Sequence, residues 1–325
     1  MKKRIRKKIS KTSVLKNTTI ESDDVSIGDK VKLEGVFIKA KKIIIKANAV
    51  LTNCKLFSDG IVSIGKNSVI KENAVINAFG GIDIGNRTII DRDVIIGGMQ
   101  SQKSKIEIGD DCVVLYRSYI NTTGKISIGN NVGIGGYSLI FSHSAWQNVL
   151  EGNPYKFADV IIRDNVWLPW NVTVMPGIVV GKNATIGSGS VITKNIPPNV
   201  FAAGVPAKII RTKKSRKLSD LEKDKIMREI LTDFGDYLTK FSKIPNQALE
   251  SVDSYKIITK NNSLIYTTKF KNFNAKDIIV SFKIPNKLKT NHEWIELDSK
   301  KSKINTELST NFVTFIRRYG IKIKS

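Results

Sequence analysis

Residues 162–197 read IRDNVW-LPWNVT-VMPGIV-VGKNAT-IGSGSV-ITKNIP, six consecutive hexads that each begin with an aliphatic residue. Clear hexads also begin at Ile64, Ile84, Ile108 and Ile128, and weaker ones follow Ile27. Gly, Asn or Asp often comes directly after the aliphatic residue, and a small residue often stands four positions on. A helix with 3.6 residues per turn would scatter these aliphatic side chains around its surface. The period of six instead indicates a repeating unit of one short strand and one turn.

Three such units make one triangular coil in which every leading aliphatic side chain points toward the axis. Gly and Asn suit the turns, because a positive φ angle costs them little. Stacked coils bury a continuous ladder of aliphatic side chains and pair each strand with its neighbours. The extra residues Met99–Lys105 and Trp146–Asp159 must leave the coils as loops. The repeat therefore predicts a parallel β-helix.

The pattern resembles the hexapeptide-repeat acyltransferases, and between Ile128 and Arg211 it is most similar to sugar O-acetyltransferases of the maltose, galactoside and polysaccharide type. The resemblance implies left-handed coils, since right-handed crossovers are the general rule and would not suggest this hand. It also implies acetyl-CoA as the acyl donor, no metal, and a homotrimer with active sites between subunits. The expected fold class is mainly β: a left-handed parallel β-helix of hexapeptide repeats, followed by a small α/β domain or extension.

Three segments are expected: a basic N-terminal tail at 1–19, the β-helix at 20–212 with a loop at 146–159, and an α/β domain of unknown role at 213–325. In the last segment, Ser219 and Glu222 are spaced as a capping box that opens a helix. Strands are predicted from apolar runs at 255–259, 263–268, 277–283 and 294–297. A final helix containing Phe312, Phe315 and Ile316 is predicted to stop at Gly320.

The formal net charge of +24 is concentrated in the two appendages. The first sixteen residues contain eight Lys or Arg and no acidic residue. Residues 17–212 carry 21 basic and 16 acidic groups, whereas residues 213–325 carry 24 and 13. This distribution favours a polyanionic neighbour, such as an acidic polysaccharide acceptor or anionic headgroups at a membrane surface, and nucleic acid is the less favoured partner. A solvated tail that aids solubility is the alternative explanation.

Cys54 and Cys112 lie far apart in apolar segments, which predicts buried, reduced thiols rather than a disulfide or zinc site. No apolar run approaches the ~20 residues that cross a bilayer. The basic start MKKRIRKKISK is not followed by the apolar run of a secretory signal. We therefore expect a cytoplasmic protein, with peripheral contact at the inner face of the membrane through the basic N-terminus.

Histidine is the expected catalytic base, because a neutral imidazole can accept the proton of a hydroxyl near neutral pH. The chain contains only His143 and His292. His143 closes a full coil just before the loop at 146–159, as the catalytic histidine of the resembled family does, whereas His292 lies outside the repeat and is expected to be inert. Ser142 and Ser144 are interpreted as turn or orienting groups rather than nucleophiles. Two histidines are too few for the three-histidine zinc site of a γ-class carbonic anhydrase on the same solenoid.

The resemblance also assigns residues to the donor and acceptor sides of the site. It places CoA contacts at Trp167, Ser188, Thr193, Lys194, Lys208 and Arg211. Trp170, which follows Pro169, departs from the small residues common in the family. It is counted with the donor site, where its indole would narrow the acyl end of the groove, and stacking on a sugar ring or surface packing are the alternatives. Acceptor contacts are expected from the aromatic residues Trp146 and Tyr155, and from Arg117 or Asn121 in place of a family asparagine.

The resulting hypothesis is direct transfer of acetyl from acetyl-CoA to a sugar hydroxyl, in a bacterial surface polysaccharide such as a capsule or O-antigen. An N-acetyltransferase acting on an amino-sugar would use the same base and donor. A non-catalytic solenoid that binds polyanions through its basic ends would explain the charge, but not His143 combined with the CoA-type register.

Overall fold

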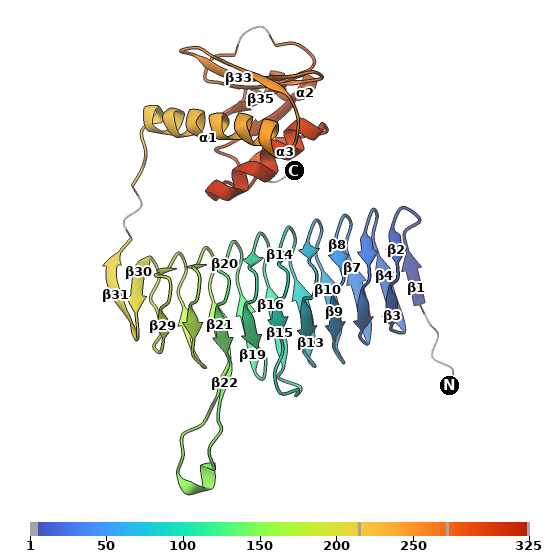
Figure 1. Ribbon diagram of the computed structural model, residues 1–325, viewed down its shortest axis with the longest axis vertical. Helices are drawn as coiled ribbons and strands as arrows, with labels where there is room; N and C mark the ends of the chain where they lie inside the picture. Colours follow the sequence, from blue (N-terminus) through green and yellow to red (C-terminus); the bar gives the residue numbers. More distant parts are fainter. Residues whose placement is uncertain (1–5, 214–215, 271–272, 324–325) are drawn as a thin grey trace. The chain divides into compact units, whose positions relative to one another are not determined.

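The computed structural model describes residues 6–213, 216–270 and 273–323 (Figure 1). The chain divides into two units, Met1–Ser215 and Arg216–Ser325. The first unit is built from three long sheets whose strands follow one another in rotation along most of the chain.

Sheets A, B and C form the three faces of the first unit. Sheet A contains, in spatial order, β1 (Arg6–Ile9), β4 (Asp24–Ile27), β7 (Lys42–Ile45), β10 (Ile61–Ile64), β13 (Gly81–Ile84), β16 (Lys105–Ile108), β19 (Lys125–Ile128), β24 (Val160–Ile162) and β27 (Val179–Val180). Sheet B contains β2 (Val14–Lys16), β5 (Lys32–Glu34), β8 (Val50–Thr52), β11 (Val69–Ile70), β14 (Ile89–Ile90), β17 (Val113–Val114), β20 (Gly133–Ile134), β25 (Trp167–Leu168), β28 (Thr185–Ile186), β30 (Val200–Gly204) and β31 (Ala207–Thr212). Sheet C contains β3 (Thr19–Glu21), β6 (Phe37–Lys39), β9 (Lys55–Phe57), β12 (Val75–Asn77), β15 (Ile95–Ile96), β18 (Tyr119–Asn121), β21 (Leu139–Phe141), β26 (Thr173–Val174) and β29 (Val191–Ile192).

Parallel pairing aligns the aliphatic residues of successive coils. In sheet A, Ile64 pairs with Ile84, Ile84 with Ile108 and Ile108 with Ile128. These side chains are at most 4% exposed and belong to one apolar core that runs through the unit. The predicted left-handed parallel β-helix is confirmed.

Extra residues leave the coils almost entirely at one edge, where the chain passes from sheet C to sheet A. From Ile64 to Ile70 and from Ile70 to Ile76 the chain advances six positions each, but from Ile76 to Ile84 it advances eight. Farther along, the same passage carries the loop between β15 and β16 and the hairpin at 142–159. Both protrude from the same side of the β-helix (Figure 1). We call this edge the C–A edge.

The Asn residues predicted for the turns adopt positive φ angles, for example 56° at Asn131 and 59° at Asn165. Asn131, Asn165, Asn183 and Asn199 stack in successive coils, and their side-chain amides donate to one another at 2.8, 3.0 and 2.8 Å. The turn residues therefore also link the coils, in addition to supplying the required backbone conformation.

The boundary predicted between tail and β-helix is wrong where the structure describes it. Residues 6–21 form β1, β2 and β3, a complete first coil, with Ile9 opposite Ile27 and Leu15 opposite Leu33. Backbone hydrogen bonds to the next coil hold this segment, and they tolerate the Lys residues that face solvent. The run of positive charge concealed the hexad spacing of Ile9 and Leu15. Residues 1–5 of the predicted tail lie outside the described residues.

The second unit is an α/β domain with a six-stranded mixed sheet. The strands, in spatial order, are β32 (Asn246–Glu250), β33 (Ser254–Thr259), β34 (Ser263–Thr267), β35 (Asp277–Ser281), β36 (Glu293–Glu296) and β37 (Lys301–Lys303). The helices are α1 (Asp220–Lys240), α2 (Asn286–Asn291) and α3 (Glu307–Ile316), followed by the short turn η2 (Arg317–Tyr319). Phe234 of α1 packs 5.1 Å from Phe312 and 5.2 Å from Phe315, centroid to centroid, at the centre of the core.

Most elements of this unit were predictable. The capping box at Ser219 and Glu222 is formed, and Gly320 adopts the left-handed conformation after α3 and η2. The four predicted strands correspond to β33–β36. The edge strands β32 and β37 were missed, because their exposed side chains show no apolar pattern. No helix in the described part of the chain is long and apolar enough to cross a membrane.

Both cysteines are buried and free, as predicted. Burial in the core of the β-helix raises the pKa of the Cys54 thiol to about 12. Cys54 is therefore protonated and unreactive at neutral pH.

Because alternate residues of each strand point toward the core, alanine substitutions at the two residues of β15 should have unequal effects on stability. Ile96 is fully buried, whereas Ile95 is 49% exposed on the outer face of sheet C. Ile96→Ala should destabilise the β-helix by about 2–5 kcal/mol, because it leaves a cavity between coils. Ile95→Ala should change stability by less than about 0.5 kcal/mol. Urea unfolding followed by circular dichroism compares the two, and equal effects would contradict the predicted orientation of the strand.

Candidate active site

His143 lies at the base of a β-hairpin that leaves the C–A edge. After β21 the chain forms β22 (His143–Ser144), the turn η1 (Val149–Glu151) and β23 (Lys156–Phe157), and it then returns to sheet A (Figure 1). His143 is paired with Phe157 across the hairpin, and their ring centroids are 4.8 Å apart. The segment predicted as a loop at 146–159 is therefore the outer part of an ordered hairpin.

Both legs of the hairpin are fastened to the preceding coil. The hydroxyl of Ser142, which is fully buried, donates to the carbonyl oxygen of Asn121 at 2.7 Å and accepts from the N–H of Gly124 at 2.8 Å. On the other leg, the Asp159 carboxylate accepts from the N–H of Lys125 at 2.9 Å. These bonds define the position from which His143 projects, and they engage the hydroxyl of Ser142 in a structural role.

A pocket of about 570 Å³ opens beside His143. Its lining combines the outer faces of β18 and β21 with the first residues of the hairpin: Tyr119, Asn121, Phe141, His143, Ser144, Ala145, Trp146, Gln147 and Pro154. The indole of Trp146 is 97% exposed, and His143 is partly buried. The pocket thus offers a titratable nitrogen, an exposed aromatic face and several polar groups to one ligand.

The polar groups of the pocket are held in defined orientations. Asn121 is 8% exposed, and its amide nitrogen donates to the hydroxyl of Tyr119 at 3.3 Å. Its amide oxygen accepts from the N–H of Thr123 at 3.2 Å. Phe141 packs against Tyr119 with ring centroids 6.0 Å apart. Aromatic faces with a few fixed polar groups suit the apolar and hydroxyl-bearing sides of a sugar ring.

Two of the four predicted acceptor residues lie outside this pocket. Arg117 precedes β18 whereas Asn121 ends it, so the two lie at opposite edges of sheet C. The Arg117 guanidinium stacks on the Tyr116 ring at 4.9 Å and lies 3.7 Å from Asp93. Tyr155 is on the hairpin, 63% exposed and 6.3 Å from the Phe157 ring, but it does not line the pocket.

The predicted donor residues lie farther along the β-helix. Trp167 is on the outer face of β25 and Trp170 is at the edge between sheets B and C, and they are 39% and 47% exposed. Both indoles pack closely against glycines of the preceding coil, since a Cβ atom at Gly133 or Gly136 would collide with the ring. Ser188 occupies the coil after Trp170 at the same edge.

The four remaining donor residues are exposed near the C-terminal end of the β-helix. Thr193 and Lys194 follow β29, and Lys208 and Arg211 lie on β31. The Arg211 guanidinium packs over the Phe201 ring at 5.6 Å. Within one chain, His143 is on the C–A edge, whereas Trp170 and Ser188 are on the edge between sheets B and C. A single chain therefore does not bring the base and the predicted pantetheine path together.

Several residues of the pocket were not identified from the sequence. Tyr119 and Phe141 point outward from sheet C, which the hexad register could have indicated, because they stand next to inward-facing aliphatic residues. Phe157 does not line this pocket but packs on His143, and it could not have been found in this way, since the segment around it carries no alternating pattern. Among the described residues, no group of three or more His, Cys, Asp or Glu side chains is placed to hold a metal ion.

Known proteins match the part of the chain that carries the repeat. Residues 159–194 match the family model "Bacterial transferase hexapeptide (six repeats)". A galactoside O-acetyltransferase of Escherichia coli K12 is 38% identical over 114 residues, which are 34% of this chain and 56% of the relative. The protein named "Putative lipopolysaccharide biosynthesis O-acetyl transferase WbbJ", from the same organism, is 27% identical over 188 residues, 54% of this chain and 87% of the relative.

The polysialic acid O-acetyltransferase OatWY, whose structure is known, has a sequence 25% identical to this one. The comparison covers 68% of this chain and 93% of that chain, with a TM-score of 0.35. The chain spans about half the length of the first curated relatives that it matches. The repeat visible in the sequence, the stacked coils and the match over residues 159–194 agree with one another. Residues 159–194 of this chain therefore carry the hexapeptide repeat that is found in a family of bacterial transferases.

Proposed function

We propose that this protein is an acetyltransferase that moves the acetyl group of acetyl-CoA to a hydroxyl of a sugar in a bacterial surface polysaccharide, such as a capsule or O-antigen. The observation that carries the proposal is the position of His143, which projects from a fastened hairpin into a pocket with an exposed indole and an oriented amide. The names of the two relatives, which refer to galactosides and lipopolysaccharide biosynthesis, support a sugar acceptor.

In the proposed reaction, the imidazole of His143 takes the proton of the acceptor hydroxyl as its oxygen attacks the thioester carbonyl. The carbon–sulfur bond of the tetrahedral intermediate then breaks, and the departing thiolate receives the proton from the imidazolium. The products are the sugar acetate ester and CoA. The Phe157 ring, 4.8 Å from the imidazole, restricts its rotation and shields one face from water. General-base assistance of this kind contributes about 10²–10⁴-fold to the rate.

Two copies of the chain would have to share each site. His143 and the residues proposed to bind the pantetheine arm, Trp167, Trp170 and Ser188, lie on different faces and edges of one β-helix. A homotrimer that sets the C–A edge of one subunit beside sheet B of the next would bring them together, and a closed ring gives three equivalent sites. Lys194, Lys208 and Arg211, all exposed, would then neutralise the phosphates of CoA.

An acidic polymer and a peripheral membrane location are proposed from the distribution of charge. The first coil exposes Lys7, Lys8, Lys11 and Lys16 to solvent. Such a surface attracts both an acidic polysaccharide and the anionic inner face of the cytoplasmic membrane, where a lipid-linked precursor would be available. Transfer to an amino group of an amino-sugar would use the same pocket, and it is distinguished by including amino-sugars among the acceptors assayed.

The first test of this proposal is the replacement of the base. His143→Ala should fold normally and lower kcat by roughly 10²–10⁴-fold, measured as release of the CoA thiol with sugars, oligosaccharides and amino-sugars as acceptors. His292→Ala is the control, because His292 lies in the second unit, and its rate should match the wild type. A rate for His143→Ala within a few-fold of the wild type would remove His143 from the mechanism.

The second test concerns the shared site. Ser188→Trp should block the donor path, so that it and His143→Ala are each inactive alone. When the two variants are assembled together, about a quarter of the sites of a trimer combine an intact base with an intact donor side, and activity should return to that level. Mixtures that stay inactive, together with light scattering that reports a monomer, would show that one chain carries the whole site.

A further inference from the structure

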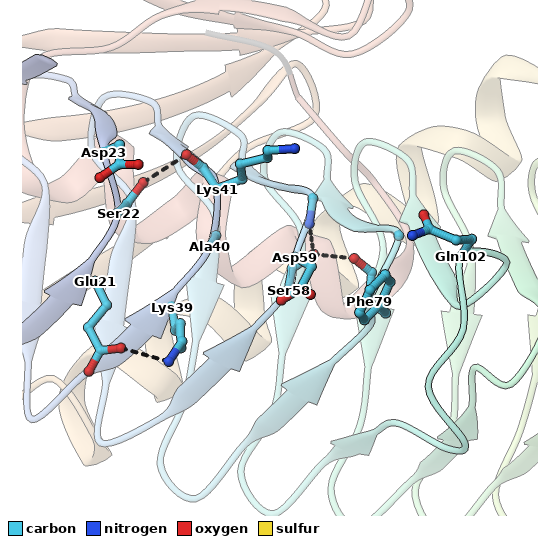
Figure 2. Close-up of a pocket in the computed structure, with 12 residues that line it drawn as sticks. Glu21, Ser22, Asp23, Lys39, Ala40, Lys41, Ser58, Asp59, Phe79 and Gln102 are labelled. Atoms are coloured by element: carbon cyan, nitrogen blue, oxygen red, sulfur yellow. Dashed lines mark hydrogen bonds and ion pairs between the residues drawn. The ribbon is translucent and has the colours of Figure 1, made fainter. Parts of the chain in front are cut away.

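A second pocket lies on the C–A edge, among the N-terminal coils and away from His143. It has a volume of about 770 Å³ and extends from the coil of β3 to the loop that follows β15 (Figure 2). The chain passes from sheet C to sheet A over seven positions between Ile20 and Ile27, and over eight between Leu56 and Ile64. Because the other two edges use shorter passages, this edge projects farther and can form a groove. We call this pocket the edge groove.

The floor of the edge groove is rigid. Ser58 is 6% exposed, and its hydroxyl donates to the carbonyl oxygen of Phe79 at 3.1 Å and accepts from the N–H of Gly60 at 3.0 Å. The N–H of Phe79 donates to the side-chain oxygen of Gln100 at 2.9 Å. The backbone of Phe79 is therefore held from two sides, and its half-buried ring lines the groove as an aromatic platform (Figure 2).

The rims of the edge groove are polar and nearly balanced in charge. Glu21 pairs with Lys39 at 3.1 Å. The side chains of Lys41, Asp59 and Gln102 line the groove and engage in no hydrogen bond or ion pair with the part of the chain that the structure describes. The charged lining residues are Glu21, Asp23, Asp59, Lys39 and Lys41. A lining of mixed donors and acceptors suits the hydroxyl groups of a neutral sugar chain. A sugar chain that carries a carboxylate on every unit would be repelled, because the lining has more negative than positive charges.

A separate pocket, which shares no lining residue with the edge groove, lies beyond it on the C–A edge. This smaller pocket, of about 350 Å³, lies between the loop after β15, at Met99 and Lys103, and the returning leg of the hairpin, at Phe157 and Asp159. The Phe157 ring that lines this pocket also packs against His143. From β12 to β21 there are three strand spacings in sheet C, and from β3 there are six. The loop after β15, which carries Gln102, is two spacings from β21, so at ~4.8 Å per spacing the groove extends from about 10 to 29 Å from the coil of His143.

We infer that the edge groove binds a run of uncharged sugar units of the acceptor polymer while a distant unit of the same chain occupies the pocket at His143. The inference rests on the proposed function and deepens it, because it requires an acceptor much longer than a disaccharide. In this arrangement Phe79 stacks on one sugar ring. The Asp59 carboxylate accepts hydrogen bonds from the hydroxyls of that ring, and the Gln102 amide donates hydrogen bonds to them. Acidic units of the polymer are then bound elsewhere, such as on the lysines of the first coil.

The experiment uses the 325-residue chain and three series of oligosaccharides with one to eight units: maltooligosaccharides, N-acetylglucosamine oligomers and oligogalacturonides. Phe79→Ala and Asp59→Ala alter the edge groove, and Glu72→Ala is the matched control, an exposed acidic residue on another edge. Transfer rates are measured against chain length, and binding of each octamer is measured by calorimetry without acetyl-CoA. Circular dichroism verifies that the variants are folded.

For the wild type, kcat/KM should rise with chain length for an uncharged series. Phe79→Ala and Asp59→Ala should raise KM for the octamer at least tenfold and leave kcat and all monosaccharide parameters unchanged, whereas Glu72→Ala should have no effect. Any of three results would overturn the inference. The transfer rate could be independent of chain length, the variants could affect transfer to monomer and octamer equally, or the octamer could bind equally well to wild type and variants. Calorimetry tests binding to the edge groove independently of transfer. If no octamer binds at millimolar concentration, the inference about the groove is refuted. If no acceptor is acetylated, the proposed function is refuted instead.

Discussion

The structure depends on the burial of one aliphatic side chain every six residues along the β-helix. Each rung, such as Ile64 above Ile84, has apolar neighbours only if the next coil returns to the same register. Burial of a whole aliphatic side chain stabilises the fold by about 1.5–3 kcal/mol, so the ladder as a whole strongly disfavours a shift of register. Residues can be inserted only where the chain turns between faces, and here nearly all insertions occur at the C–A edge.

This constraint separates stability from chemistry. The three sheets provide a rigid support. The inserted segments do not have to follow the hexad pattern, so they can carry the side chains proposed for chemistry and binding. His143 lies on one of these insertions, and Ser142 and Asp159 attach it to the regular coil beneath. The edge groove arises in the same way from the slightly longer passages of the earlier coils. One edge of the β-helix therefore provides both the proposed base and the proposed binding path for a long acceptor.

The parts of the structure governed by the local period could be predicted from the sequence. The hexads identified the coils from Ile27 onward, and the Asn residues identified turns with positive φ angles. The first coil escaped prediction because the run of positive charge concealed the aliphatic residues Ile9 and Leu15, which pair with Ile27 and Leu33 of the next coil. The hairpin around Phe157 and the groove around Phe79 also could not be predicted, because they depend on contacts between residues one or more coils apart.

The central claim is that acetyl transfer takes place at His143 on the C–A edge. A crystal structure of the 325-residue chain with CoA and an acceptor oligosaccharide tests it most directly. The account predicts that the CoA sulfur lies near the imidazole of His143, with one sugar hydroxyl within hydrogen-bond reach of the ring, about 3 Å. The CoA should extend along Trp170 and Ser188 of a neighbouring subunit. CoA bound away from His143, or a sugar hydroxyl that contacts a different base, would contradict the account.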